Sequence, residues 1–522
     1  MTTSESQAPE NDVPDPDGPG GPVVRTASGA VRGLRERGLS VFRGIPFAAP
    51  PVGPDRFQAP RPPRPWDGIR ETYAFGPPSP QEPGFSGRAA QLPSVAGDEW
   101  LTVNVWTPDP DPSAARPVLV WIHGGAYRLG HGGQPGYDAQ HLAREGDVVV
   151  VTFNYRLGME GFALWTGAPA NRGLLDQVAA LEWVQENIAG FGGDPAQVTV
   201  FGESAGAGSI ASLLAMPRAR GLFRRAIGQS VPGTLFSVDL ARDIATELAA
   251  EVGRTPTVAD LSEVDPQQLT RAGQTLGAKM PAYTGRWGQA GPTSVPFAPV
   301  VDGDVLPTTP WEALAAGAGR EVDLLVGHNR DEFRLFLVMA DLVGKITDDR
   351  AGQTLRLYAP GGATGEAAYR SAFPDAGPEL LFERVQTDWL FAIPSLRLAE
   401  AQLAGGGRAH VYELTWPAPD GTGVLGACHV LDIPLLFGTY GADLGALFFP
   451  GGKPTPEAER LTAFLQHAWL AFARTGDPGW PEYDTDSRAV QILDAEPRVG
   501  PYPEEGSRRI WEGYAFGALP LL

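Results

Sequence analysis

Residues 198–214 read Val-Thr-Val-Phe-Gly-Glu-Ser-Ala-Gly-Ala-Gly-Ser-Ile-Ala-Ser-Leu-Leu. The first four residues form a short apolar run typical of a buried strand, and residues 207–214 can continue as a helix. Between them, residues 202–206 have the spacing Gly-x-Ser-x-Gly, whose small residues leave room for a sharp strand-to-helix turn. In so glycine-rich a chain the pentapeptide alone would arise by chance about 0.3 times, so its position between strand and helix carries the signal. The stretch predicts that the hydroxyl of Ser204 projects as a nucleophile at the start of a helix.

Further short apolar runs occur at residues 118–122, 148–153 and 324–326, each rich in Val, Ile or Leu. Runs of this kind are typical of strands that are buried on both faces. Between two of them, residues 174–188 place apolar side chains three and four positions apart, which predicts a helix. Strands that alternate with helices indicate an α/β fold, with a mostly parallel central sheet and helices on both faces.

A second glycine-rich loop follows the run at residues 118–122, where the chain reads His123-Gly124-Gly125-Ala126-Tyr127. In α/β-hydrolases, a loop upstream of the nucleophile supplies backbone N–H groups that stabilise the oxyanion formed on the substrate carbonyl. Losing one such donor typically lowers the rate by about 10²–10³. Two motifs in the right order and context favour acyl-transfer chemistry over a chance glycine-rich turn.

Composition narrows the class of partner. The chain has 522 residues, 43% of them hydrophobic, and a formal charge of −20, which disfavours binding to nucleic acid and to anionic membranes. No apolar run is long enough to span a bilayer, and residues 1–22 lack the basic start and apolar stretch of a secretory signal. We therefore expect a soluble, cytoplasmic protein. The sequence leaves its oligomeric state open, and a monomer is compatible with it.

The domain organisation is expected to be simple. Residues 1–22 offer almost no apolar surface and are expected to form a flexible acidic tail, followed by a single domain over residues 23–522. Residues 56–93 are rich in Pro and Gly, and residues 235–310 carry helical patterns that Pro-Thr and Gly interrupt. Both segments are interpreted as insertions rather than separate domains. Since loops beyond the strand ends shape the pockets of α/β enzymes, we expect both insertions to contribute pocket walls.

Several longer stretches resemble the type B carboxylesterase and cholinesterase family, and most closely its bacterial p-nitrobenzyl-esterase-like members. The resemblance extends from about residue 23 to about residue 513. Besides the two motifs above, it rests on residues 42–53 (FRGIPFAAPPVG), 101–108 (LTVNVWTP), 154–158 (NYRLG), 171–177 (NRGLLDQ) and 191–195 (FGGDP). So many matches in order are highly specific, and they imply the α/β-hydrolase fold with large loop and helical insertions.

The resemblance also implies the partners of Ser204. The family's acid is a Glu in a stretch like G-x-x-x-D-E-G, which residues 327–333 match and which indicates Glu332. Its base is a His in a G-x-x-H stretch, which residues 426–429 match and which indicates His429. The order Ser, acid, His is the one that this fold uses. By the same resemblance, the oxyanion donors are the N–H groups of Gly125, Ala126 and Ala205.

This sequence departs from the family pattern in three places. Phe333 stands where the family usually has Gly, and Trp100 replaces the first Cys of its usual disulfide. Residues 86–91 (SGRAAQ) lack the aromatic side chain that binds choline in cholinesterases, which argues against a dedicated choline ester. Cys428 is the single cysteine, so no disulfide can form within the chain.

Further polar residues near the motifs could also take part in the chemistry. His123 more simply braces the oxyanion loop than moves protons, and His328 lies too close in sequence to Glu332 to be a good base. Asp331 could replace Glu332 in principle, and Glu203 could either tune the field around His429 or only pack behind the turn. Cys428 is interpreted as a small buried side chain. No histidine spacing suggests a metal site, and we expect no cofactor.

The sequence therefore predicts a serine carboxylesterase that cleaves small-molecule esters through an acyl-enzyme on Ser204. The same triad could act mainly on carbamates, amides or thioesters, because the sequence does not report the leaving group. A hypothesis from another class is a catalytically silent, cholinesterase-like binding or adhesion protein. The presence of all three triad residues argues against it.

Overall fold

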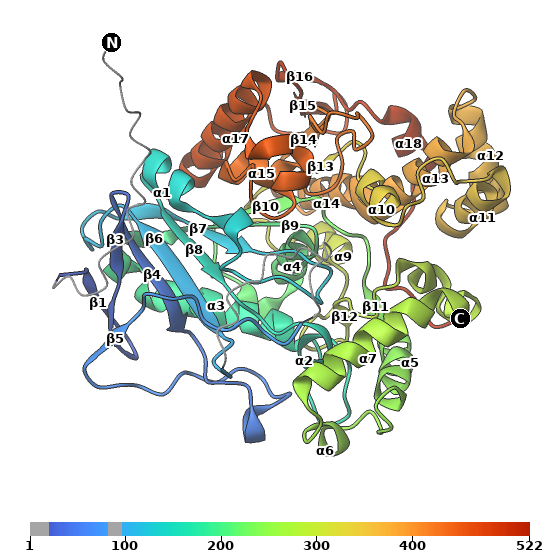
Figure 1. Ribbon diagram of the computed structural model, residues 1–522. Helices are drawn as coiled ribbons and strands as arrows, with labels where there is room; N and C mark the ends of the chain where they lie inside the picture. The colour runs from blue at the N-terminus through green and yellow to red at the C-terminus, as the bar shows by residue number, and fades with distance from the viewer. Residues whose placement is uncertain (1–19, 82–96) are drawn as a thin grey trace, which may run out of the picture.

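An eleven-stranded sheet runs through the computed structural model, which describes residues 20–81 and 97–522 (Figure 1). Most of the tail expected at residues 1–22, the segment 86–91 and the end of the insertion at 56–93 lie outside the described residues. The spatial order of the strands is β16-β15-β14-β13-β10-β9-β7-β8-β6-β4-β3. Their bounds are β3 Leu34–Glu36, β4 Leu39–Pro46, β6 Thr102–Thr107, β7 Arg116–Ile122, β8 Val149–Phe153, β9 Gly193–Glu203, β10 Arg225–Gln229, β13 Asp323–Asn329, β14 Ala409–Leu414, β15 Ala489–Leu493 and β16 Arg498–Pro501.

The centre of the sheet is parallel and its two edges are antiparallel. Strands β8, β7, β9, β10, β13, β14 and β15 pair in parallel, whereas β6, β4 and β3 on one side and β16 on the other pair antiparallel. The apolar runs expected to be strands lie in this parallel part, in β7, β8, β9 and β13, although β8 begins at Val149, one residue later than expected. The mostly parallel α/β sheet is thus confirmed.

Helices cover both faces of the sheet, and Figure 1 shows α1 and α17 on one side and α3 on the other. The α-helical segments are α1 Gln140–Gly146, α2 Gly158–Gly161, α3 Arg172–Asn187, α4 Ala205–Ala215, α5 Val238–Ala250, α6 Val258–Leu261, α7 Pro266–Lys279, α8 Thr284–Trp287, α9 Pro310–Ala315, α10 Arg334–Met339, α11 Asp348–Tyr358, α12 Ala363–Ala372, α13 Pro378–Thr387, α14 Ile393–Ala404, α15 Asp432–Phe437, α16 Gly445–Phe448, α17 Pro456–Thr475 and α18 Glu505–Ile510. The helix expected at residues 174–188 is α3, and the one expected after Ser204 is α4.

The two faces of the sheet build two separate parts of the core. Because side chains alternate along a strand, Val118 and Val120 of β7 pack on the α3 side, while Leu119 and Trp121 pack on the α17 side. The α4 and α14 side chains belong to the α3 side, and those of α1 and α15 belong to the α17 side. A sheet buried on both faces explains why its strands are continuous apolar runs.

Smaller elements lie outside the main sheet. Strands β1 Val23–Thr26, β2 Gly29–Arg32 and β5 Ile69–Glu71 form a three-stranded sheet, and β11 Phe236–Ser237 pairs with β12 Val300–Val301. The insertion at residues 235–310 contains α5, α6, α7 and α8. Within the described residues, no helix is both long and apolar enough to cross a membrane.

The topology brings the two sequence motifs to one edge of the sheet. The oxyanion loop follows the carboxyl end of β7, Ser204 follows β9, and Glu332 follows β13 by three residues. The segment that carries His429 follows β14. Since β7, β9, β13 and β14 run in the same direction, the loops at their carboxyl ends meet at this edge.

Candidate active site

Ser204 lies on a strained turn between β9 and α4. Its backbone has φ 55° and ψ −124°, a conformation that L residues rarely adopt. The Ser204 N–H donates to the carbonyl of Gln229 at 2.9 Å, which ties the turn to the end of β10. The hydroxyl therefore stands at the N-terminus of an eleven-residue helix, where unpaired backbone N–H groups favour negative charge.

The glycines of the motif are required by close packing. A Cβ at Gly202 would lie 2.6 Å from the carbonyl oxygen of Ile122, and one at Gly206 only 2.0 Å from the same atom. Both distances are far below van der Waals contact, so only glycine lets the turn pack against the end of β7. The motif thus brings the turn and the oxyanion loop together.

The three side chains expected to form a triad are in hydrogen-bond contact. His429 Nε2 lies 2.9 Å from Ser204 Oγ, and His429 Nδ1 lies 2.6 Å from Glu332 Oε2. His429 and Glu332 are almost fully buried. This arrangement lets the imidazole accept the Ser204 proton while the carboxylate fixes its orientation.

The carboxylate of Glu332 is held by further donors. Its Oε1 accepts hydrogen bonds from the Asn329 backbone N–H at 2.8 Å and from Ser230 Oγ at 2.5 Å. Ser230 follows β10, so a fifth strand end contributes to the site. Ser230 was not among the residues expected from the sequence, because the strand before it, Arg-Ala-Ile-Gly-Gln, is not a continuous apolar run.

Side chains outside the triad also contact His429. The ring of Phe391 stacks on the imidazole with centroids 4.3 Å apart, and Glu203 Oε1 lies 3.1 Å from His429 Nε2. Burial lowers the pKa of His429, but the Glu203 and Glu332 carboxylates outweigh burial and raise it above its ordinary value. Burial raises the pKa of Glu203, against the opposing effect of His429. The Glu203 carboxylate therefore faces the His429 imidazole directly and does more than pack behind the turn.

The oxyanion loop lies against the nucleophile. A Cβ at Gly124 would be 3.2 Å from Ser204 Cβ, and Gly125 and Ala126 have φ values of 108° and 54°. The loop is held by the Gly158 N–H, which donates to the Tyr127 carbonyl at 2.7 Å. Its backbone is thus fixed next to the atom that would attack a carbonyl carbon.

His123 braces this loop. Its Nδ1 lies 2.8 Å from the Gly124 carbonyl oxygen. The hydroxyl of Tyr155 donates to the backbone carbonyl of His123 at 2.7 Å. Burial lowers the pKa of His123 to about 3, so the ring stays neutral. A neutral Nδ1–H then donates to the Gly124 carbonyl.

The side chains of His328, Asp331 and Cys428 make their contacts away from the Ser204 hydroxyl. His328 Nε2, on β13, contacts the hydroxyl of Tyr502 at 3.1 Å. The Asp331 carboxylate accepts from the Ala427 N–H at 2.9 Å, so Glu332 and not Asp331 reaches the imidazole. The Cys428 thiol is buried, and burial raises its pKa.

The local backbone at Glu332 tolerates Phe333 because no left-handed conformation is needed there. Phe333 has φ −73° and ψ −9°, which any L residue adopts. Its N–H donates to Thr387 Oγ1 at 3.1 Å, and its ring packs on Phe336 and Phe382. The departure from the family pattern therefore leaves the position of Glu332 unstrained.

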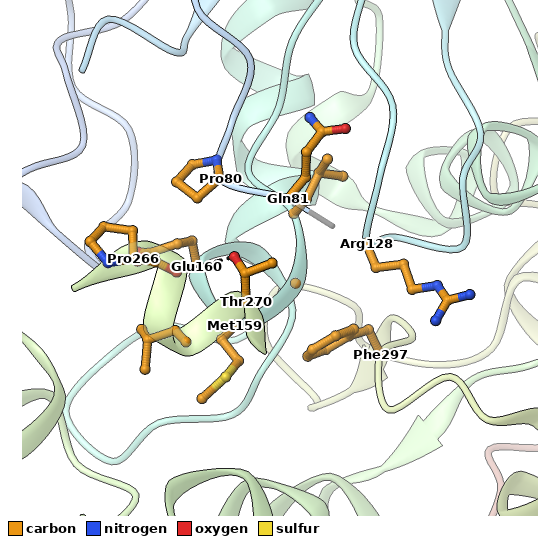
Figure 2. A pocket seen from close by; sticks show the side chains of 11 residues that line it. Pro80, Gln81, Arg128, Met159, Glu160, Pro266, Thr270 and Phe297 are labelled. Atoms are coloured by element: carbon orange, nitrogen blue, oxygen red, sulfur yellow. Dashed lines mark hydrogen bonds between the residues drawn. The ribbon is translucent and has the colours of Figure 1, made fainter. Parts of the chain in front are cut away.

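A small pocket adjoins the oxyanion loop (Figure 2). Arg128, two residues after Ala126, lines it, together with Gly158, whose N–H holds the loop. The described part of the insertion at 56–93 contributes Pro80 and Gln81, and the insertion at 235–310 contributes side chains of α7 and Phe297. Residues of both insertions thus line this pocket, and the pocket lining contains none of the three triad residues.

Within residues 20–81 and 97–522, no three or more His, Cys, Asp or Glu side chains are grouped so that they could hold a metal ion.

A model of the carboxylesterase family matches residues 20–511. The chain belongs to this family. It is 37% identical to a para-nitrobenzyl esterase of Bacillus subtilis (strain 168), over 93% of this chain and 98% of that protein. It is also 36% identical to a phenmedipham hydrolase of Pseudarthrobacter oxydans, over 91% and 95% of the two chains.

Solved structures of carboxylesterases have a similar fold. The fold matches carboxylesterase EST55 of Geobacillus stearothermophilus with a TM-score of 0.81 and 37% identity, over 94% of this chain and 99% of that one. It matches a PNB esterase structure with a TM-score of 0.81 and 35% identity. The chain is thus an α/β-hydrolase and a carboxylic ester hydrolase, which confirms the class of enzyme expected from the sequence.

Proposed function

We propose that the chain hydrolyses small-molecule carboxylic esters in two steps through an acyl-enzyme on Ser204. His429 takes the Ser204 proton as the hydroxyl attacks the ester carbonyl, and Glu332 holds and stabilises the imidazolium. The carbonyl oxygen gains a negative charge, which the N–H groups of Gly125, Ala126 and Ala205 stabilise. His429 then protonates the leaving alcohol, and a water molecule, activated by His429, releases the acid.

The single observation that carries this proposal is the continuous contact Ser204–His429–Glu332, with distances of 2.9 and 2.6 Å. Three residues far apart in sequence meet in the geometry that a nucleophile, a base and an orienting acid require. A silent binding protein would have no such use for this contact. A preference for carbamates, amides or thioesters finds no specific support in the geometry, and the cytoplasmic location stays a prediction.

The test is the hydrolysis of p-nitrophenyl acetate and butyrate by Ser204→Ala. We expect kcat to fall by about 10⁴-fold or more, because loss of the nucleophile leaves only binding and oxyanion stabilisation. Ser212→Ala is the matched control, since its hydroxyl lies in the same helix and donates to the Gly208 carbonyl. A fluorophosphonate should label the wild type and the control but not Ser204→Ala. Hydrolysis by Ser204→Ala at the wild-type rate would refute the proposal.

A further inference from the structure

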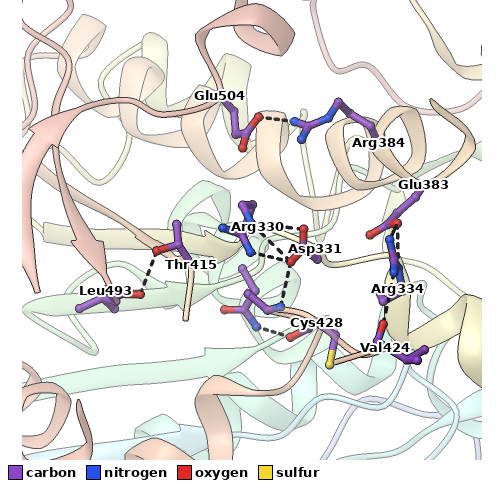
Figure 3. Close-up of polar contacts among 12 residues, drawn as sticks. Arg330, Asp331, Arg334, Glu383, Arg384, Thr415, Val424, Cys428, Leu493 and Glu504 are labelled. Carbon is purple, nitrogen blue, oxygen red and sulfur yellow. Dashed lines mark hydrogen bonds and ion pairs between the residues drawn. The ribbon is translucent and has the colours of Figure 1, made fainter. Parts of the chain in front are cut away.

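The loop that carries the acid and the loop that carries the base are joined directly. Three hydrogen bonds connect residues 329–331 with residues 427–428 (Figure 3). Asn329 Nδ2 donates to the Cys428 carbonyl at 2.8 Å, the Asp331 N–H donates to the Ala427 carbonyl at 2.9 Å, and the Ala427 N–H donates to Asp331 Oδ2 at 2.9 Å. These bonds lie directly before His429 in the chain.

Residues 415–431 contain no helix or strand, so the position of His429 depends on such contacts. The Arg334 guanidinium donates to the Val424 carbonyl at 3.2 Å and pairs with Glu383, which anchors the loop farther from the histidine. Asp420 bonds three N–H groups within the loop itself, those of Thr422, Gly423 and Leu425. Of these carboxylates, only that of Asp331 reaches the backbone two residues before His429.

The Asp331 carboxylate is placed closely. Gly426 has φ 57°, and a Cβ there would lie 2.6 Å from Asp331 Oδ2, so glycine allows the carboxylate to approach. Arg330 Nη2 lies 3.1 Å from the same oxygen and balances its charge. No bond joins Asp331 to the His429 ring, whose Nδ1 bonds Glu332.

We propose that Asp331 is a positioning residue, which keeps the His429 imidazole in simultaneous contact with Ser204 and Glu332 by fixing the backbone of residues 426–428. This inference rests on the proposed function of His429 as the base. The contacts of the His429 ring with Ser204 and Glu332 leave the ring little freedom to move. A displacement of such a group by about 1 Å can lower the rate by about 10²-fold. A carboxylate oxygen at the Ala427 N–H prevents this displacement.

The test compares three variants of one side chain, with the pH dependence of kcat/KM, kcat and KM measured for p-nitrophenyl butyrate. Asp331→Asn keeps an acceptor oxygen at the same place and should retain kcat within about threefold. Asp331→Glu keeps the charge but displaces the oxygen by one methylene group, and Asp331→Ala removes it. We expect both to lose kcat by about tenfold or more with KM within about twofold, because the chemical step depends on the ring position.

The pH dependence separates positioning from simple destabilisation. When His429 moves away from Glu332, its pKa should fall toward the ordinary value, so the acidic limb of kcat/KM should move to lower pH in Asp331→Glu and Asp331→Ala. Asp420→Ala is the matched control, because it removes carboxylate bonds from the same loop away from His429. It should change the melting temperature without moving this limb.

Three results would overturn the inference. One is wild-type kcat in both Asp331→Glu and Asp331→Ala. Another is a defect in Asp331→Asn that is absent from Asp331→Glu, which would mean that the charge beside Arg330 is what counts. The third is a loss of kcat with an unmoved acidic limb, as expected for instability alone. If Asp331→Ala does not fold, the pair Asp331→Asn and Asp331→Glu decides. The proposed function is judged separately, since only Ser204→Ala tests the nucleophile.

Discussion

Glu203 Oε1 lies 3.1 Å from His429 Nε2, the same nitrogen that contacts Ser204 Oγ at 2.9 Å. The His429 imidazole therefore stands between two carboxylates, with Glu332 at one ring nitrogen and Glu203 at the other. Burial alone would lower the pKa of His429, but the two negative charges favour the protonated imidazole and raise it. A protonated His429 cannot accept the Ser204 proton, so activity should increase as pH rises through this pKa.

Glu203→Gln should move this increase to lower pH. The substitution removes a negative charge next to the imidazole, so the pKa of His429 falls and more of the neutral base is present at pH 6–7. We expect the acidic limb of kcat/KM to move down by about one pH unit, because an adjacent charge typically shifts a pKa by 1–3. The measurement is kcat/KM between pH 5 and 10. An unmoved limb would show that Glu203 is uncharged when His429 titrates.

Ser230→Ala should weaken the orientation of the base. The Ser230 hydroxyl donates to Glu332 Oε1 at 2.5 Å, and both side chains are fully buried. A hydrogen bond to a charged group contributes about 1.5–3 kcal/mol, so we expect kcat to fall by about tenfold or more if most of this is lost in the transition state. Ser395→Ala is the matched control, because its buried hydroxyl accepts from the backbone N–H of Val231, next to Ser230, and does not donate to Glu332. Equal activity of the two variants would contradict the expectation.

The sequence predicts the parts of this site whose structure depends on residues that are close together along the chain. The strand, turn and helix around Ser204 follow from apolar runs and from glycines whose Cβ atoms would clash with Ile122. The helix after Ser204 was predicted to start at residue 207, two residues later than the start of α4 at Ala205. The reason is that the glycines and alanines at this point form no apolar pattern with a helical period. Glu332 and His429 were indicated by the family resemblance, since nothing in their local pattern shows that they meet.

Contacts between distant segments were not predictable in this way. Ser230 bonds Glu332 across 102 positions, and Phe391 reaches His429 from a π-helical turn at Asp388–Ala392. A π-helical turn adds a residue to the helical repeat, so a period of 3.6 does not reveal which side chain faces the site. The antiparallel edge strands, such as β4 and β6, were missed because they are not continuous apolar runs.

Gly206→Ala should disrupt the nucleophile turn and the oxyanion loop together. The new Cβ would lie 2.0 Å from the Ile122 carbonyl oxygen and 3.0 Å from that of His123. Since backbone must move to relieve this overlap, we expect fluorophosphonate labelling of Ser204 to slow by at least about 10²-fold, as for loss of an oxyanion donor. Gly285→Ala is the control, because nothing lies within 4 Å of its Cβ position. Normal labelling of Gly206→Ala would show that the turn can relax cheaply.

Asp176→Ala should be among the most destabilising single substitutions. Asp176 accepts from the N–H, Nε and Nη2 of Arg156 at 3.0, 2.8 and 2.7 Å, and both side chains are 0% exposed. Removing one partner leaves a buried charge, which costs about 3–5 kcal/mol. By contrast, Asp109→Ala breaks an exposed pair with Arg35 at 3.6 Å, which should contribute at most about 1 kcal/mol.

The double variant Arg156→Leu with Asp176→Leu distinguishes two contributions to stability. One is the attraction between Arg156 and Asp176, and the other is the cost of leaving one of these charges buried without its partner. With neither charge present, no ion is left unpaired, so we expect the double variant to be more stable than Asp176→Ala in thermal unfolding. Loss of the Arg156–Asp176 pair should also disturb the candidate active site, because Tyr155, next to Arg156, donates to the His123 carbonyl of the oxyanion loop. If the double variant unfolds at a lower temperature than Asp176→Ala, the destabilisation comes from lost backbone and packing contacts of Arg156 and not from its unpaired charge.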